Sequence, residues 1–194
     1  MQKINRNFDI LTGLKDLETL QSIEKFPIFM GCTSKPKSQD LFAEQTWQIS
    51  KNNGIIQLKS LLPLEILYPE HHNAGIIGNT WIEHHKKFGE FILKFGSKSI
   101  LEIGGSHGIL AKYCMEKKKL KWTILEPNPI PIKNCKAKFI KGFFDNKFIN
   151  REPIDAIVHS HVFEHIYSPI DFMKDISNKL DINQRLIFSI PNMN

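Results

Sequence analysis

The chain has 194 residues, of which 41% are hydrophobic and 24% are charged. These proportions are typical of a globular domain and argue against global disorder, a collagen-like repeat or a long coiled coil. The 26 Lys and Arg residues outnumber the 20 Asp and Glu residues, which gives a formal charge of +6. Arg occurs only at positions 6, 151 and 185, so the excess is mostly Lys. This bias is typical of AT-rich bacterial genomes and indicates nucleic-acid binding only weakly.

The cysteine content indicates the compartment. Cys32, Cys114 and Cys135 are too few and too far apart for a disulfide scaffold or a four-thiolate zinc site, so we expect a reducing environment. The first residues lack a continuous apolar core, and no stretch approaches the roughly 18 apolar residues of a membrane span. The sequence therefore predicts a soluble, cytoplasmic protein without a membrane partner.

Residues 1–78 form the first predicted domain, a small irregular amino-terminal lobe. Residues 30–40 are loop-like, and the apolar stretch 55–68 is interrupted by Pro63. Residues 79–194 form the second predicted domain, which begins with a helix over about 80–95. Thr80 and Glu83 form a predicted capping box, and Gly96 closes the helix. Apolar residues recur at helical spacing in this segment: Ile82, Phe88, Phe91, Ile92 and Phe95.

Five short apolar segments follow as predicted strands, at 99–103, 121–125, 137–144, 154–161 and 184–190. Their spacing suits parallel strands joined by crossovers, which predicts a doubly wound α/β sheet. The crossover between 126 and 137 is short and Pro-rich, so we expect little helix there. The last crossover has Ser168 as a predicted N-cap and Pro169 at the first helical position. The apolar residues expected to face the sheet from this helix are Phe172, Met173, Ile176 and Leu180.

A glycine-rich turn follows the first of these strands, in the sequence LEIGGSHGIL at 101–110. Glycine tolerates the dihedral angles of such a turn and lets backbone amides approach a ligand closely. A dinucleotide-binding turn would have Gly in the order G-x-G-x-x-G, but Ser106 and Ile109 occupy the second and third of these positions. The dinucleotide interpretation therefore fails.

The remaining pattern places Glu102 two positions before Gly104 and six before Gly108. It resembles motif I of the class I S-adenosylmethionine-dependent methyltransferases. The resemblance implies a Rossmann-like core in which Glu102, Gly104, Gly105, Ser106 and Gly108 form part of the cofactor site. The family often has a middle glycine where this chain has Ser106. An ordinary strand-to-helix turn without a ligand is the alternative interpretation.

The second predicted strand runs into Glu126, which is followed by Pro127. A carboxylate at this place can accept hydrogen bonds from both hydroxyls of a ribose. The resemblance implies that Glu126 and Pro127 contact the adenosine part of the cofactor, whereas a solvated strand-end Glu is the alternative. Phe143 and Phe144 stand where the family usually places adenine contacts, and core packing is the alternative for either ring.

Residues 159–166, HSHVFEHI, follow the fourth predicted strand, at the sheet edge where open α/β proteins bind ligands. The spacing of His161, Glu164 and His165 also matches a hydrolase pattern in which two helical histidines bind zinc and the Glu activates water. A zinc hydrolase needs a further ligand, so it is the weaker alternative and we expect no metal. The acids that follow in the chain are Asp171, Asp175 and Asp181.

Class I methyltransferases commonly carry a segment similar to SHVFEHIYSP at this place. The resemblance implies that the backbone around Ser160 and His161 lies along the methionine part of the cofactor. It also makes His165 a candidate general base for the acceptor, since the pKa of histidine is naturally close to neutral. A structural histidine bonded to backbone is the alternative.

The first domain resembles the amino-terminal lobe of the nucleotide-sugar C-methyltransferases and their relatives in polysaccharide gene clusters. Trp47, the Gln-Leu segment at 55–58 and the His-containing segment at 80–85 follow the layout of that subgroup. Ser50 and Asn53 stand where the subgroup has zinc-binding cysteines. Neither side chain binds zinc as a thiolate does, so we predict that the lobe lacks this metal.

The same resemblance implies that the lobe acts as a lid over the cofactor. Tyr68 is the strongest lid candidate, by analogy with tyrosines that the subgroup uses near the transferred methyl group, and we pair it with His165 as the predicted catalytic residues. The other lid candidates are His71, His72, Asn79 and Trp81. The histidine pairs at 71–72 and 84–85 have no acid or thiol to complete a metal site.

The resemblance as a whole implies a methyltransferase that converts S-adenosylmethionine to S-adenosylhomocysteine. We expect a small-molecule acceptor, a sugar nucleotide or another precursor of a surface (capsular) polysaccharide. The Asn/Asp-Pro-Pro-aromatic sequence of base-methylating relatives is missing, which argues against a nucleic-acid acceptor. The family sheet usually has seven strands, so we expect a core truncated after its fifth strand. A non-catalytic cofactor-binding module is the second hypothesis.

Overall fold

A computed structural model describes residues 3–28, 36–67, 78–150 and 152–192. The chain forms two compact units, Met1–His72 and Asn73–Asn194. The sequence-based boundary at 78/79 lies at the start of the first long helix of the second unit. Within the described ranges, no helix is long and apolar enough to cross a membrane.

The first unit contains two small antiparallel sheets that the sequence analysis did not predict. Strands β2 (Leu17–Pro27), β3 (Phe42–Ser50) and β4 (Ile56–Leu58) form one, and β1 (Ile4–Asn5) pairs with β5 (Ser60–Leu61) in the other. A 3-10 turn η1 (Lys37–Gln39) and a short helix α1 (Leu64–Leu67) complete the unit. Strand β2 is exposed along almost its whole length, and its pairing with β3 shifts register twice. Its sequence therefore lacks the apolar alternation by which a half-buried strand is recognised.

Two turns of the same design lie in the first unit, at residues 9–13 and 50–54. In each, the glycine N–H donates to the carbonyl four residues earlier: Gly13 to Asp9 at 2.8 Å and Gly54 to Ser50 at 3.0 Å. Both glycines have left-handed backbone, with φ values of +73° and +75°. Glycine adopts this conformation without strain, which explains its place at the end of each turn.

Buried carboxylates hold these two turns together. Asp9, which is 1% exposed, accepts hydrogen bonds from the Leu11 N–H at 2.9 Å, the Thr12 hydroxyl at 2.6 Å and the Asn53 amide. The Ser50 hydroxyl donates to Asp16. Asn53 and Ser50, at the positions of the subgroup's zinc thiols, are thus hydrogen-bonded to carboxylates. Among the described residues, no group of three His, Cys, Asp or Glu side chains is arranged to hold a metal ion.

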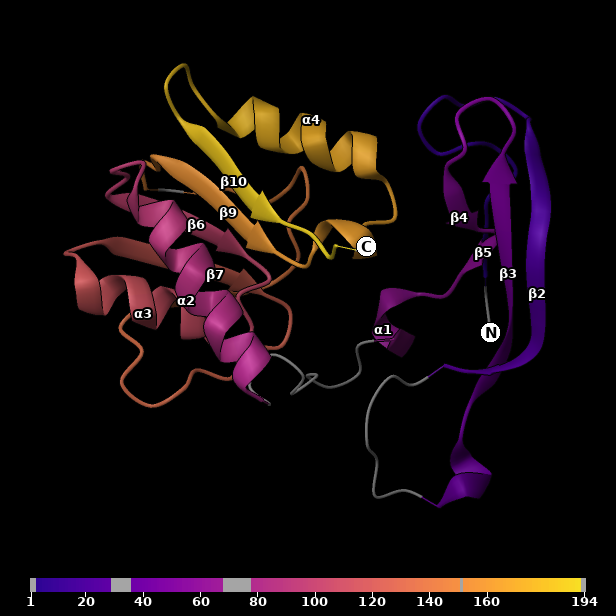
Figure 1. The fold of residues 1–194 in the computed structure, drawn as a ribbon, viewed down its shortest axis with the longest axis horizontal. Helices are drawn as coiled ribbons and strands as arrows, with labels where there is room; N and C mark the ends of the chain where they lie inside the picture. The colour runs from indigo at the N-terminus through magenta and orange to yellow at the C-terminus, as the bar shows by residue number, and fades with distance from the viewer. Residues whose placement is uncertain (1–2, 29–35, 68–77, 151, 193–194) are drawn as a thin grey trace. The chain divides into compact units, whose positions relative to one another are not determined.

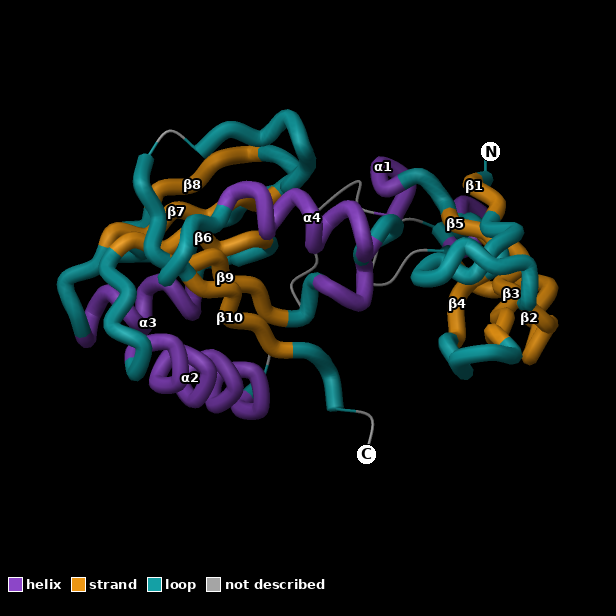
Figure 2. The backbone as a smooth tube through the Cα atoms, turned by 90° about the horizontal axis from the view of Figure 1, so that it is seen from above, coloured by secondary structure: helices purple, strands orange, loops and turns teal. Residues whose placement is uncertain are grey.

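The second unit is built on a parallel five-stranded sheet in the order β10-β9-β6-β7-β8 (Figure 2). All five predicted strands are confirmed, and their bounds are Ser99–Ile103 (β6), Lys121–Glu126 (β7), Lys138–Lys141 (β8), Ala156–Ser160 (β9) and Arg185–Ser189 (β10). The third is shorter than the predicted 137–144. Its partner β7 ends at Glu126, opposite Lys141, so the chain beyond Lys141 has no strand to pair with.

Three helices cover the two faces of this sheet (Figure 1). Helices α2 (Asn79–Leu93) and α3 (Ile109–Lys117) contribute to one apolar core, whereas α4 (Pro169–Lys179) packs into the core on the other face. Parallel crossovers are right-handed. Strand β7 lies on one side of β6 while β10 lies beyond β9 on the other side, so the helices α3 and α4 of these crossovers fall on opposite faces.

The helix ends differ from the predictions in detail. Helix α2 begins at Asn79 with Gly78 as its N-cap, so Thr80 lies inside the first turn and the predicted capping box is wrong. Glu83 instead pairs with Lys86 at 2.7 Å. Helix α4 has the predicted Ser168 at its N-cap and Pro at its first turn, although no side-chain cap bond forms. Of the four residues expected to face the sheet from this last helix, Phe172 and Ile176 are buried, Leu180 is half-buried and Met173 is 37% exposed.

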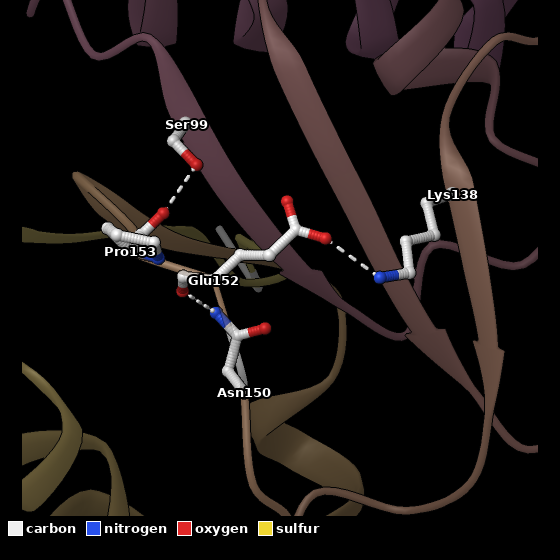
Figure 3. Close-up of polar contacts among 5 residues, drawn as sticks. All are labelled: Ser99, Lys138, Asn150, Glu152 and Pro153. Carbon is white, nitrogen blue, oxygen red and sulfur yellow. Dashed lines mark hydrogen bonds and ion pairs between the residues drawn. The ribbon is translucent and has the colours of Figure 1, made fainter.

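Polar contacts fix the segment that leads into β9 at the amino-terminal edge of the sheet (Figure 3). The Ser99 hydroxyl donates to the Pro153 carbonyl at 2.7 Å, Lys138 pairs with Glu152 at 2.8 Å, and the Asn150 amide donates to the Glu152 carbonyl at 2.7 Å. A hollow of about 350 Å³ lies at this edge, lined in part by Lys98 and Asp155. The Asp155 carboxylate already accepts the N–H groups of Lys98 and Ser99, so it is a structural group.

We expect Asp9→Ala to destabilise the first unit by about 1–3 kcal/mol, because three donors lose their buried acceptor. Hydrogen bonds from Thr12 and Leu11 lower the pKa of Asp9, so its contribution is present above pH 4 and is lost as the pH falls further. Hydrogen exchange of the 50–55 amides should therefore accelerate in the variant at pH 6. The exposed Asp40→Ala is the control, and equal exchange in both variants would contradict the role of Asp9.

Candidate active site

The glycine-rich turn lies where the motif predicts it, between the end of β6 at Ile103 and the start of α3 at Ile109. It bonds to the neighbouring strand, since the Gly104 N–H donates to the Leu125 carbonyl at 2.8 Å. Gly108 is the N-cap of α3 with a φ of 75°. Ser106 also has left-handed backbone, with a φ of 46°. This strained conformation explains why a glycine would suit the position of Ser106.

Glu102 lies beneath this turn rather than on its surface. It is 4% exposed, and its carboxylate accepts a hydrogen bond from the Trp122 indole at 2.7 Å. A Cβ atom at Gly105 would stand 2.7 Å from the Glu102 carboxyl carbon, so the absence of a side chain lets the turn cross the carboxyl group. Burial raises the pKa of Glu102 to about 7, although the Trp122 bond opposes the shift. Glu102 therefore shapes the turn from below.

Glu126 approaches the same turn from the end of β7. One carboxylate oxygen accepts the Ser106 N–H at 3.0 Å, and the other accepts the Asn128 N–H at 3.0 Å. Each oxygen keeps a further lone pair, so the half-exposed carboxylate can still accept two neighbouring hydroxyl groups. Pro127 follows directly and is also half-buried. The geometry suits the predicted ribose contact, which remains a prediction.

The sequence analysis overlooked His107, which joins the turn to the loop after β7. Its Nδ1 lies 2.9 Å from the Ile130 carbonyl, and its own carbonyl accepts the Ile132 N–H at 3.0 Å. Its side chain is almost fully buried, at 4% exposure. A histidine inside a glycine-rich turn was the available signal, but nothing in the sequence identifies the distant carbonyl that it contacts.

The two predicted adenine contacts have different surroundings. Phe144 packs against Phe148 and Phe172, with ring centroids 5.9 and 5.5 Å away, as part of the core under α4. Phe143 is 48% exposed. Both lie beyond the end of β8. Core packing therefore accounts for Phe144, whereas Phe143 presents a ring on which a purine can stack.

The segment that follows β9 packs against the glycine-rich turn. A Cβ atom at Gly104 would stand 2.6 Å from a methyl carbon of Val162, so the two segments are in contact. Ser160 ends β9, and His161 follows in left-handed backbone, with its N–H donating to the Ser189 carbonyl at 3.0 Å. The carboxyl ends of β6, β7 and β9 thus meet around one site, as open α/β sheets predict.

Glu164 and His165 lie before the start of α4. They belong to a separate 3-10 turn, η3 (Phe163–His165), and His165 is exposed. His161 precedes this turn and lies 3.5 Å from Glu164 between Nδ1 and a carboxylate oxygen. The zinc-hydrolase pattern needs its two histidines on one helix, and this arrangement does not provide it. The structure therefore does not support that alternative.

Helix α2 brings His84, which the sequence analysis did not assign to the site, next to Trp81 and His161. The His84 ring lies 4.9 Å from that of His161 and 5.8 Å from that of Trp81, and the Trp81 ring lies 5.0 Å from that of His161. The His84 Nε2 lies 2.8 Å from the Ser160 hydroxyl. Burial and the neighbouring imidazoles of His161 and His85 lower the pKa of His84. Only the folded sheet brings α2 to the end of β9.

The predicted lid residues are only partly described. Tyr68, His71 and His72 lie outside the described residues. Asn79 and Trp81 lie in the first turn of α2, within the second unit.

Comparison with known proteins identifies the family. A family model described as "Methyltransferase domain" matches residues 78–194, more than half of the chain. The chain therefore belongs to this family of S-adenosylmethionine-dependent methyltransferases, in which S-adenosylmethionine is the cofactor. The predicted class I methyltransferase family and the Rossmann-like, mainly parallel sheet are thus confirmed. No curated protein matches the chain.

Solved methyltransferase structures resemble the chain over about half of its length. The plantazolicin methyltransferase BpumL, in complex with a monoazolic desmethylPZN analog and S-adenosylhomocysteine, is 21% identical with a TM-score of 0.43. The match covers 52% of this chain and 42% of BpumL. An O-methyltransferase family protein from Burkholderia thailandensis is 8% identical with a TM-score of 0.45, over 55% of this chain and 36% of its own.

The buried Glu102 makes the stability of the core dependent on pH. Because its pKa is raised on folding, the folded protein holds a proton that the unfolded chain releases, so stability falls as the pH rises from about 4 towards 7. We expect Glu102→Gln to be more stable than the wild type by about 3 kcal/mol at pH 8 and by only about 1 kcal/mol at pH 5. Urea unfolding at both values measures this difference. Parallel pH profiles for the wild type and Glu102→Gln would contradict it, and the exposed Glu116→Gln is the control.

Proposed function

We propose that this chain is a cytoplasmic methyltransferase that acts on a small metabolite, a sugar nucleotide or another precursor of a surface polysaccharide. The observation that carries the proposal is the hydrogen bond between Glu126 and the glycine-rich turn. A half-exposed carboxylate bonded to the Ser106 N–H stands at the carboxyl edge of a family-matched core. The cofactor supplies an activated sulfonium methyl group, so the protein has to bind and orient the acceptor and to remove its proton.

We assign the nucleoside end of the cofactor to the β7 side of the site. Glu126 accepts the ribose hydroxyls through the free lone pairs of its two oxygens, with Pro127 beside it. The backbone of the glycine-rich turn approaches the cofactor closely, and the buried Glu102 supports the conformation of this turn. The turn residues assigned to the cofactor are Gly104, Gly105, Ser106 and Gly108. Phe143 is the ring that stacks on the adenine, since Phe144 is occupied in the core.

Removal of the acceptor proton is assigned to His165, with Tyr68 as its proposed partner. His165 is exposed after the end of β9, so its ring is accessible to an acceptor, and an imidazole is the side chain that most often acts as a general base. The polysaccharide-precursor acceptor is supported by the subgroup layout of residues 47–85. In this chain hydrogen bonds from Ser50 and Asn53 replace thiol ligands, so the first unit does not need the subgroup's zinc to hold these two turns.

We expect the protein to bind S-adenosylhomocysteine but not NAD, and Glu126→Ala to weaken this binding by about 1–3 kcal/mol, roughly 10-fold to 100-fold, because charged hydrogen bonds are lost. Isothermal titration calorimetry measures both ligands. Glu116→Ala, an exposed carboxylate on α3, is the matched control and should bind as the wild type does. Unchanged affinity in Glu126→Ala would contradict the ribose assignment.

The acceptor proposal is tested by incubating the protein with methyl-labelled S-adenosylmethionine and a panel of nucleotide sugars. We expect label in one of them, and at least a tenfold lower rate for His165→Gln at unchanged S-adenosylhomocysteine affinity, as general-base removal predicts. Label transfer only to a peptide or nucleic acid from a cell extract would exclude the sugar assignment.

A further inference from the structure

A group of imidazoles beside β9 has no role in the function proposed above. His84 and His85 come from α2, and His161 follows β9. The ring centroid of His84 lies 5.7 Å from that of His85 and 4.9 Å from that of His161. Trp81 contacts His84 edge to face, and Phe88 stacks on it at 5.9 Å. Three ionisable rings of the same charge type thus share one small, partly buried region. This arrangement is unfavourable for the free protein whenever more than one ring is protonated.

Hydrogen bonds hold His84 in place at the ends of two strands. Its Nε2 lies 2.8 Å from the Ser160 hydroxyl at the end of β9, and the Ser160 hydroxyl lies 2.9 Å from the Ser189 hydroxyl at the end of β10. The helix, which precedes the glycine-rich turn in the chain, is thereby tied to the carboxyl edge of the sheet. An imidazole placed in this way is oriented before a ligand arrives, which reduces the entropy cost of binding.

The charges around His84 favour an anion. The groups that face it are His85 on its own helix, His161 after β9 and the neutral Ser189 on β10. Glu164 of η3 pairs with His161 at 3.5 Å, and among the described residues no acidic side chain forms an ion pair with His84. A bound carboxylate would stabilise the protonated form of His84 and so raise its lowered pKa.

The position of this group relative to Glu126 identifies the anion. Strand β6, with the glycine-rich turn at its end, lies between β7 and β9. Glu126 holds the ribose of the ligand on the β7 side. If the ligand then crosses the turn, its other end lies towards β9. For S-adenosylmethionine that other end is an amino acid with a free carboxylate.

We propose that His84, oriented by Ser160, binds the carboxylate at the amino-acid end of the cofactor, and that the imidazole group takes up a proton as it does so. The inference rests on the cofactor assignment of the proposed function. The proton enters from solvent onto the His84 ring, and no covalent bond is made or broken. Binding therefore becomes tighter as the pH falls from 8 to 6, whereas a site that stays neutral would add no such pH dependence.

The test compares S-adenosylmethionine with decarboxylated S-adenosylmethionine, which lacks only the carboxylate. We expect the wild type to prefer the first ligand about tenfold or more at pH 7, and His84→Leu to bind both alike. Calorimetry in buffers of different ionisation enthalpy should show proton uptake with S-adenosylmethionine, and none with the decarboxylated ligand or in His84→Leu. Lys87→Ala, an exposed cation on the same helix, should keep both the preference and the proton uptake.

The outcomes separate this inference from the proposed function. Equal binding of the two ligands by the wild type overturns the role of His84 and leaves the cofactor assignment intact. A preference that persists in His84→Leu overturns it as well. Binding of neither ligand by folded wild-type protein overturns the cofactor assignment and this inference with it. The wild-type comparison needs no variant, so equal binding of the two ligands overturns the inference even where His84→Leu does not fold.

Discussion

The site depends on one packing constraint, the passage of the glycine-rich turn over the buried carboxyl group of Glu102. The carboxyl group is held by the Trp122 indole at 2.7 Å, and the turn can cross it only because Gly105 has no side chain. The backbone amide of Ser106 then points to Glu126, whose carboxylate accepts it at 3.0 Å. Two acidic side chains thus lie against the same turn. Glu102 is buried and has a raised pKa, whereas Glu126 is half-exposed and accessible to a ligand.

The topology of the sheet decides what surrounds this turn. Strand β6 has β7 on one side and β9 on the other, and right-handed crossovers send α3 and α4 to opposite faces. The strand order therefore reverses next to β6, and loops leave the sheet in different directions at this point. Glu126 comes from one side of the reversal, and Ser160 and His161 come from the other. The contact between Gly104 and Val162 joins the two sides.

The second unit was predictable because its elements have strong local signals. Its strands are short apolar runs, and the central strands β6 and β9 are buried on both faces. The strands lie at the predicted positions, and β8 is shorter than predicted because its partner β7 ends at Glu126. The first unit was not predicted as a sheet. Strand β2 is exposed and bulged, so no alternation appears in its sequence, and its pairing with β3 joins residues 15 to 33 positions apart in the chain.

The sequence by itself determined the family core and the chemistry of its central motif, because Glu102, the glycines and Glu126 stand at fixed short spacings from predicted strands. Such spacings survive folding unchanged. Only the tertiary structure decided which carboxylate is buried, which phenylalanine packs in the core, and that His84 meets Ser160 and His161 across 76 residues of chain. These outcomes depend on long-range packing between α2, β9 and β10, and a local sequence pattern holds no information about such pairings.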